Sequence, residues 1–235
     1  MADIEKWLGK ERIVGKTVID IGSGSGIHSL SFSLLGAERV HSIDVDPVSV
    51  EATDALHHKM QNSPQWTVSQ GSILDNGFVK RLGTFDIVYA WGVFHHTGSM
   101  WEAIANASSL VKPDGLFWFS IYAKGPRHQN DLALKRRYNA ASPFRKRLME
   151  ARWIFGLMRN RLFSLKNPFA WNEKKERGMT VYHDIVDWLG GLPYEVADES
   201  EILRFMRECG FILEDLKVAA ECGCSIYLFS RRRMN

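Results

Sequence analysis

Asp20 and the glycines that follow it have residue types and spacing suited to binding a charged ligand. Asp20 lies in a short apolar run, residues 18–21, and Gly22, Gly24 and Gly26 follow at every second position. Glycines at the start of a helix allow a ligand to lie directly against backbone N–H groups. A carboxylate at this point repels a pyrophosphate but attracts an ammonium group. The loop therefore favours a ligand that carries a positively charged amino group.

A dinucleotide is the main alternative ligand for such a loop. Its fingerprint requires Gly-x-Gly-x-x-Gly, and Ile27 stands where the third glycine would be. Asp44 lies 18 residues beyond Gly26, where a second strand is expected to end, and a carboxylate there can accept hydrogen bonds from both hydroxyls of a ribose. Asp46, directly before Pro47, is expected to cap the next helix instead. These residues together predict a nucleoside joined to a cationic amino acid.

Alternating apolar strands and amphipathic helices must position these groups. Strands are predicted at residues 18–21, 39–43, 65–70, 85–90, 116–122, 211–219 and 225–230, and helices at 27–35, 47–60, 100–111 and 199–209, with a shorter helix ending at 82. Residues 112–115 are expected to form a turn. The pattern predicts the α/β class: a doubly wound, seven-stranded, mostly parallel sheet, with one of the last two strands antiparallel.

Residues 124–195 interrupt this alternation and are predicted to be helical. We expect one domain over residues 1–235, with 124–195 as a basic helical cap inserted after the fifth strand. Residues 124–177 contain 15 basic and 4 acidic side chains, a net charge of +11, whereas the whole chain carries only +3. This asymmetry favours an anionic partner for the cap.

Apolar and basic side chains alternate within residues 143–166, which predicts one or two amphipathic helices. The stripe expected to pack on the core consists of Phe144, Leu148, Ala151, Ile154, Phe155, Met158, Leu162 and Leu165. The basic face is then solvated, or binds an anionic small substrate, an anionic membrane surface or RNA. A nucleic-acid partner is disfavoured because the chain has no recognisable RNA-binding module and no Asn-Pro-Pro-Tyr string. Peripheral membrane contact is left open, and the oligomeric state is not predicted.

Composition places the chain among ordinary globular proteins, with 45% hydrophobic and 24% charged residues. The first six residues lack the pattern of a secretory signal, so a cytoplasmic location is expected. Cys209, Cys222 and Cys224 are the three cysteines. No second pair of ligands lies at metal-binding spacing near them, so no metal site is expected.

The run Asp-x-Gly-x-Gly-x-Gly resembles the first motif of class I S-adenosylmethionine-dependent methyltransferases. Two further strings, residues 91–98 (Trp-Gly-Val-Phe-His-His-Thr-Gly) and residues 177–195, resemble a bacterial subgroup that acts on small molecules. The resemblance is firm over residues 16–122 and implies a Rossmann-like methyltransferase fold with S-adenosylmethionine as cofactor. The residues it implies for cofactor binding are Asp20, Gly22, Ser23, Gly24, Gly26, Asp44, Val45, Ser72, Ile73 and Trp91. Ser72 departs from the acidic residue that the family often places beside adenine.

Methyl transfer from a sulfonium is an in-line displacement, so alignment supplies much of the catalysis. The resemblance makes His96 the first choice for a general base, because related enzymes place a histidine there, with Tyr122 and His183 as supporting candidates. We predict a methyltransferase for a small molecule or glycan precursor, with oxygen as the accepting atom. The alternatives are an RNA or lipid methyltransferase, a non-catalytic cofactor-binding subunit and an NAD-dependent oxidoreductase.

Overall fold

A computed structural model describes residues 2–60, 65–172, 180–219 and 223–232. The chain forms two compact units: the first comprises residues 1–125 and 195–235, and the second comprises residues 126–194. Arg177, Gly178 and Met179, which begin the second subgroup string, and Cys222 lie outside the described residues. Over the ranges described, no helix has both the length and the apolar composition needed to traverse a bilayer.

The first unit is built on one seven-stranded sheet with the order β3-β2-β1-β4-β5-β7-β6. The strands are β1 (Thr17–Ile21), β2 (Arg39–Asp44), β3 (Trp66–Gln70), β4 (Phe85–Trp91), β5 (Val111–Tyr122), β6 (Phe211–Lys217) and β7 (Cys224–Arg231). β7 is antiparallel to both of its neighbours, and the pairs among β1 to β5 are parallel. The predicted doubly wound, mostly parallel fold is therefore confirmed.

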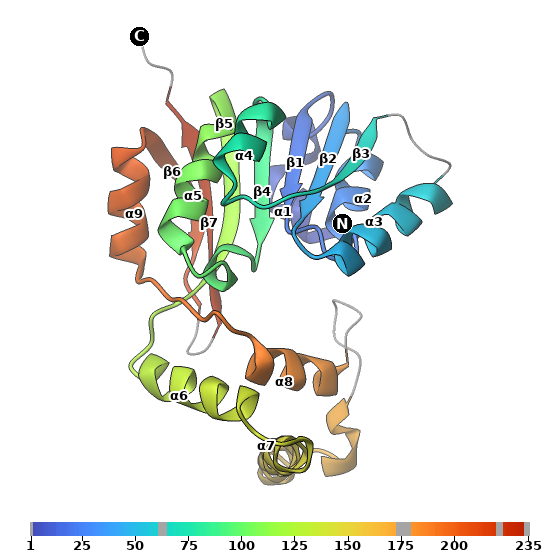
Figure 1. Ribbon diagram of the computed structural model, residues 1–235, viewed down its shortest axis with the longest axis vertical. Helices are drawn as coiled ribbons and strands as arrows, with labels where there is room; N and C mark the ends of the chain where they lie inside the picture. Colours follow the sequence, from blue (N-terminus) through green and yellow to red (C-terminus); the bar gives the residue numbers. More distant parts are fainter. Residues whose placement is uncertain (1, 61–64, 173–179, 220–222, 233–235) are drawn as a thin grey trace. The chain divides into compact units, whose positions relative to one another are not determined.

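Helices cover both faces of this sheet (Figure 1). They are α1 (Ala2–Leu8), α2 (Ile27–Leu34), α3 (Pro47–Lys59), α4 (Asn76–Leu82), α5 (Met100–Ser109) and α9 (Glu199–Glu208), with short 3-10 turns η1 (Lys10–Arg12) and η2 (Phe94–His96). Buried residues of α4, α5 and α9 pack on one face, and those of α1 and α2 pack on the other. Asp46 caps α3 through its carboxylate, as the sequence predicts.

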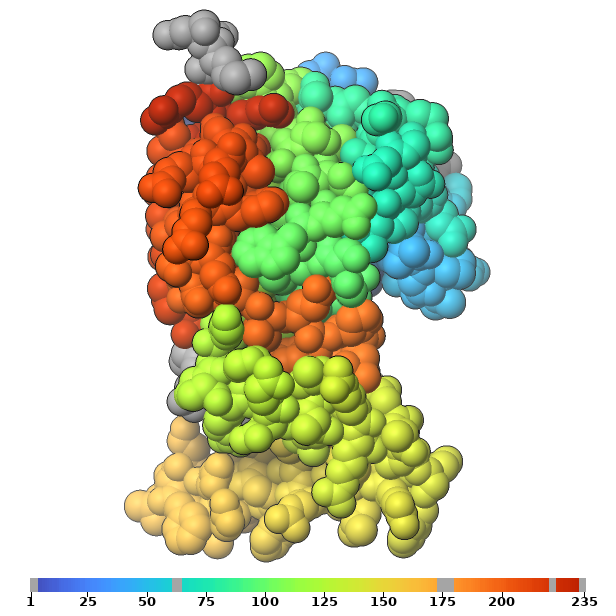
Figure 2. Space-filling model, turned by 60° about the vertical axis from the view of Figure 1, so that its left-hand side comes forward, coloured from blue at the N-terminus to red at the C-terminus, as the bar shows by residue number. Residues whose placement is uncertain are grey.

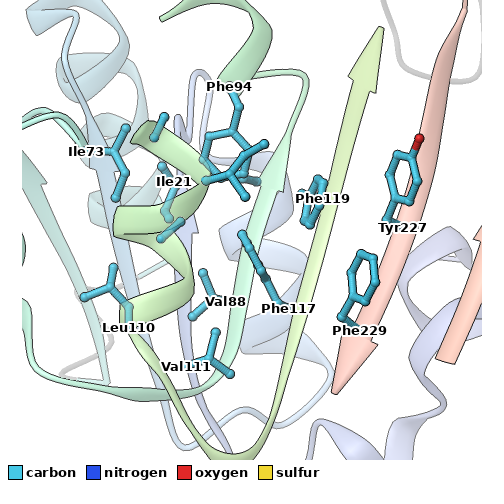
Figure 3. Packing of buried hydrophobic residues seen from close by; sticks show 14 of the residues in the cluster. Ile21, Ile73, Val88, Phe94, Leu110, Val111, Phe117, Phe119, Tyr227 and Phe229 are labelled. Carbon is cyan, nitrogen blue, oxygen red and sulfur yellow. The ribbon is translucent and has the colours of Figure 1, made fainter. Parts of the chain in front are cut away.

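Aromatic and aliphatic side chains pack together in the core under α5 (Figure 3). The Phe117 ring lies 4.6 Å from the Phe119 ring and 6.0 Å from the Phe94 ring, measured between centroids. At the surface, α5 and α9 lie side by side (green and orange-red in Figure 2), where the Trp101 and Phe205 rings are 5.0 Å apart. This packing joins α5 to the sheet and to α9.

The turn predicted at residues 112–115 is instead part of β5. Phe85 pairs with Val111 and Ile87 pairs with Leu116, so these residues bulge out of the ladder between two paired segments. Asp114 adopts a φ of 61° within the bulge. The sequence suggests a turn because Pro, Asp and Gly favour one locally, but pairing with β4 continues on both sides of them.

The second unit consists of helices packed around a small apolar cluster. Its elements are α6 (His128–Asn139), α7 (Pro143–Phe163), η3 (Pro168–Asn172) and α8 (Val181–Gly190). Tyr138, Ile185 and Leu189 form the buried centre, and Ile154 and Leu157 of α7 pack against it. The helical character predicted for this region is therefore observed in its described residues.

The packing face predicted for α7 is wrong. Of the predicted stripe, Phe144, Leu148, Phe155, Leu162 and Leu165 are all at least 60% exposed. Of the stripe, Ile154 does pack inward, and it does so beside Glu150 and Leu157, which the predicted stripe leaves out. Apolar residues lie on two sides of this helix, and neighbouring helices cover only one of them.

Candidate functional site

The glycine loop between β1 and α2 is folded tightly against two neighbouring elements. Gly22, Gly24 and Gly26 have φ values of 71°, 56° and 75°, which favour glycine. A Cβ on Gly22 would lie 2.4 Å from Cγ2 of Val93, so no side chain fits there. A Cβ on Gly24 would meet nothing within 4 Å. The loop is therefore closed on one side and leaves open space over Gly24.

Backbone and side-chain bonds to the β2 end hold this loop. The N–H groups of Gly22 and Ser23 donate to the Ile43 carbonyl at 2.8 and 3.1 Å. The Gly24 N–H donates to Asp44 Oδ2 at 2.9 Å. Asp44 Oδ1 accepts from the Asp46 N–H at 3.0 Å. A carboxylate has about four acceptor positions, so Asp44 keeps capacity for the two ribose hydroxyls expected from the sequence.

Asp20 is buried beneath the loop, with 1% of its surface exposed. Its Oδ2 accepts a hydrogen bond of 2.6 Å from Ser29 Oγ. Ser42 Oγ donates to Ser29 Oγ at 2.6 Å, and Trp66 Nε1 donates to Ser42 Oγ at 2.7 Å. Burial raises the pKa of the Asp20 carboxyl to about 6, against the lowering effect of the Ser29 bonds, and the Asp44 charge adds to the rise.

Other residues predicted to bind the cofactor lie at the same carboxyl edge of the sheet. Ser23 is buried, with its Oγ 3.1 Å from Thr53 Oγ1. Val45 is 65% exposed directly after β2. After β3, Ser72 Oγ accepts from the Leu74 N–H at 3.1 Å, and Ile73 is buried in the main core. Their contacts with a ligand remain predictions.

The end of β4 offers a second open position. The Trp91 ring packs toward α2, with its centroid 6.2 Å from that of His28. The next residue, Gly92, has a φ of 76°, and a Cβ there would meet nothing within 4 Å. Its N–H donates to Ser120 Oγ of β5 at 2.9 Å. Open space therefore lies over Gly92 as well as over Gly24.

Two of the three predicted catalytic residues, His96 and Tyr122, lie close together, one just after β4 and the other at the end of β5. The His96 and Tyr122 rings are 5.5 Å apart and nearly perpendicular. His95, next to His96 in η2, is buried, and its Nδ1 accepts from the Tyr122 N–H at 3.3 Å. The neutral tautomer that accepts at Nδ1 carries its proton on Nε2. His95 thus links η2 to the end of β5, and His96 is half-buried beside it.

His183 lies in the other compact unit, on α8. It is exposed, and its Nδ1 lies 2.7 Å from Oγ1 of Thr180, the residue that caps this helix. Its predicted role at the site stays a prediction.

The site also depends on residues that the sequence analysis did not identify. Thr53 Oγ1 donates to the Gly24 carbonyl at 2.9 Å and so ties the loop to α3. Both carboxylate oxygens of Glu195 lie 3.2 Å from the Met100 N–H, at the start of α5, and its own N–H donates to the His95 carbonyl at 3.0 Å. Glu195 ends the second subgroup string, a signal that could have pointed to it.

The comparison with protein families decides the class of the chain. A family model described as a methyltransferase domain matches residues 1–173, more than half of the sequence. This chain belongs to that methyltransferase family. The resemblance stated from the first motif is thereby confirmed, and the family uses the predicted cofactor, S-adenosylmethionine.

Curated relatives of this methyltransferase match over limited segments. A ribosomal protein L11 methyltransferase of Anoxybacillus flavithermus is 46% identical over 61 residues, which is 26% of this chain and 20% of that protein. A ubiquinone biosynthesis O-methyltransferase of Colwellia psychrerythraea is 35% identical over 109 residues, covering 46% and 42%. The chain thus spans less than half the length of these two relatives.

Solved structures share the fold of this methyltransferase at low identity. Magnesium protoporphyrin IX methyltransferase from Synechocystis PCC 6803, solved with bound SAH, has a TM-score of 0.60 and 16% identity, covering 98% of this chain and 81% of that one. PKMT2 from Rickettsia typhi, in complex with AdoHcy, has a TM-score of 0.65 and 12% identity, covering 95% and 50%. These likenesses show the fold that this chain shares with the two proteins.

Proposed function

We propose that the chain transfers a methyl group from S-adenosylmethionine to an oxygen atom of a small molecule or glycan precursor. The observation that carries the proposal is the carboxyl edge of the sheet, where open space over Gly24 and Gly92 lies next to the Asp44 carboxylate and the His96–Tyr122 pair. Ligands bind at this edge in open α/β sheets. The cytoplasm stays the proposed location.

The chemistry asked of the protein is modest. When bound, S-adenosylmethionine would supply an electrophilic methyl group and a sulfur leaving group. Asp44 would hold the ribose, and the glycine loop would hold the amino-acid part. His96 accepts the hydroxyl proton, and Tyr122 orients the acceptor. Asp20 acts from beneath the loop, through water or by favouring the ammonium group electrostatically.

Asp44→Ala tests the cofactor site. We expect its affinity for S-adenosylhomocysteine, measured by titration calorimetry, to fall about 10- to 100-fold, because two charge-assisted hydrogen bonds to the ribose are lost. Asp54→Ala on α3, where the carboxylate is half-exposed and pairs with His57 and His58, is a matched control and should bind normally. Unchanged affinity of Asp44→Ala would remove the ribose role, and binding of NAD in place of the homocysteine compound would revive the oxidoreductase alternative.

His96→Gln tests the base. Turnover should fall about 100-fold, within the range of general-base contributions, while the affinity for S-adenosylhomocysteine changes less than twofold. Turnover by the wild type should fall as the pH falls below the titration range of a histidine. Turnover by His96→Gln should not change with pH over the same range. Full turnover by His96→Gln would reduce His96 to a structural role.

The acceptor is found by following labelled methyl groups from S-adenosylmethionine into fractionated cell extract. A small, nuclease-resistant, water-soluble product supports the proposal. Label in nuclease-sensitive or lipid fractions would favour the RNA or lipid alternative. Cofactor binding without methyl transfer to any fraction would favour a non-catalytic subunit.

A further inference from the structure

The outward face of α7 carries an apolar stripe that none of the described helices of the second unit covers. Phe144, Leu148, Phe155 and Leu162 are 60% to 78% exposed. At 100° per residue they fall within a sector of about 40° on the helix surface. The apolar side chains just past the helix, Leu165 and Phe169, are more exposed still, at 97% and 79%. Contiguous exposed apolar surface of this kind marks an interaction site.

Arginines run alongside this stripe. Arg145, Arg152 and Arg159 are spaced seven residues apart, so they lie on one side of the helix, next to the apolar sector. All three are exposed, and none forms an ion pair with an acidic group among the residues described. The outward face therefore combines exposed apolar side chains with a row of positively charged arginines.

Residues 143–172 contain seven basic side chains and one acidic side chain, Glu150. Glu150 is buried on the opposite face, where its two oxygens accept hydrogen bonds from Tyr138 Oη at 2.7 Å and Tyr182 Oη at 2.9 Å. The charge that α7 and η3 present to solvent is therefore entirely positive. Such a face attracts an anionic surface at close range.

We propose that α7 is a membrane-docking helix, which lies in the plane of an anionic lipid surface with its apolar stripe in the interface and its arginines at the head groups. A helix of 21 residues is about 31 Å long, and this pattern of apolar stripe and flanking cations is that of interfacial helices. The inference is independent of the reaction proposed above.

Two other occupants fit less well. In an antiparallel symmetric dimer through this face, the arginine rows of the two copies would lie on the same flank and face each other, and like charges across an interface oppose association. Single-stranded RNA would use the arginines and the phenylalanines for phosphate contact and stacking. RNA would leave Leu148 and Leu162 without a role, whereas all four apolar side chains can insert among lipid chains.

Flotation of the full chain with lipid vesicles tests the proposal, without cofactor or acceptor. We expect binding to vesicles of phosphatidylcholine mixed with phosphatidylglycerol and little binding to phosphatidylcholine alone. Arg152→Gln with Arg159→Gln should lower the partition coefficient about 25-fold, about fivefold for each arginine. Leu148→Ser with Phe155→Ser should lower it at least tenfold, because two apolar side chains no longer enter the interface.

Matched variants in the first unit control for general losses of charge or hydrophobicity. Lys59→Gln with Lys80→Gln removes two exposed cations, and Val14→Ser with Leu34→Ser removes two exposed apolar groups. Both pairs should float like the wild type. The proposal is overturned if the α7 variants float as well as these controls, or if the wild type binds no anionic vesicle. Concentration-dependent dimerisation, or binding of a single-stranded RNA, without vesicle binding would identify one of the other occupants.

Discussion

The first unit buries phenylalanine, whereas the second unit displays it. Phe32, Phe94, Phe117 and Phe119 are fully buried against the sheet. In the second unit, Phe144, Phe155, Phe163 and Phe169 are 67% to 79% exposed. The same residue type therefore has two uses in one chain: in the first unit it holds the sheet and helices together, and in the second it forms surface.

This difference follows from how many elements surround each segment. A sheet with helices on both faces encloses its central strands, so most apolar residues of β4 and β5 are buried. The second unit has too few helices to cover both sides of α7. An apolar residue there contributes little to folding stability, which leaves it available for contact with something else.

Phe117→Ala should have the largest effect on stability. The side chain is fully buried between Phe94 and Phe119, and removing such a ring costs about 3–5 kcal/mol in the free energy of unfolding. Urea unfolding monitored by circular dichroism measures this change in the free energy of unfolding. A loss below about 1 kcal/mol would mean that the first unit does not depend on this core, and the comparison would fail.

Asp20→Asn should have an intermediate effect that depends on pH. An unfolded aspartate titrates near 3.9, and in the fold the pKa of Asp20 is about 6. Between these values the folded state binds more protons, so the stability contributed by this group falls as the pH rises from about 4 to 6, by about 2–3 kcal/mol. Melting curves of the wild type should show this loss, and those of Asp20→Asn should lack it.

Asp86→Asn is the control for the loss of stability between pH 5 and 6. Burial raises the pKa of Asp86, but hydrogen bonds from Thr17 and Lys112 outweigh it and lower the pKa to about 2. Asp86 is therefore ionised in both states above about pH 5, and the variant should keep the wild-type pH dependence between 5 and 6. Equal slopes for all three proteins would show that Asp20 is not the group responsible.

Phe155→Ala should have the smallest effect. The ring is 67% exposed, and surface substitutions change the free energy of unfolding by about 0.5 kcal/mol or less. Measured in the same urea series as Phe117→Ala, it gives the same chemical change in the opposite setting. A loss above about 1.5 kcal/mol would show that something in the chain covers this face.

Local patterns predict the first unit well. The strands β1 to β4 are short and are followed by turn or helix-start residues, and their observed bounds differ from the predicted ones by one residue at most. Asp46 caps its helix as expected from Pro47. The loop glycines and Asp44 meet because parallel strands end at one edge of the sheet.

Long-range partners could not be predicted in the same way. Ser29, Ser42 and Trp66 come from three different elements, and only the folded sheet brings them into line with Asp20. The β5 bulge depends on pairing with β4, which overrides local turn preference. For α7, helical spacing marks apolar residues on two sides, and nothing local indicates which side its neighbours cover.

The placement of Glu150 has a consequence for how the surface of α7 responds to its environment. With its carboxylate directed at two tyrosines and no histidine in the helix, the face turned to solvent offers only guanidinium and ammonium groups. Arginine does not lose its proton in proteins. Acidification of the surroundings therefore leaves the attraction of this face for anions nearly constant, whereas ionic strength, which screens exposed charges, controls it.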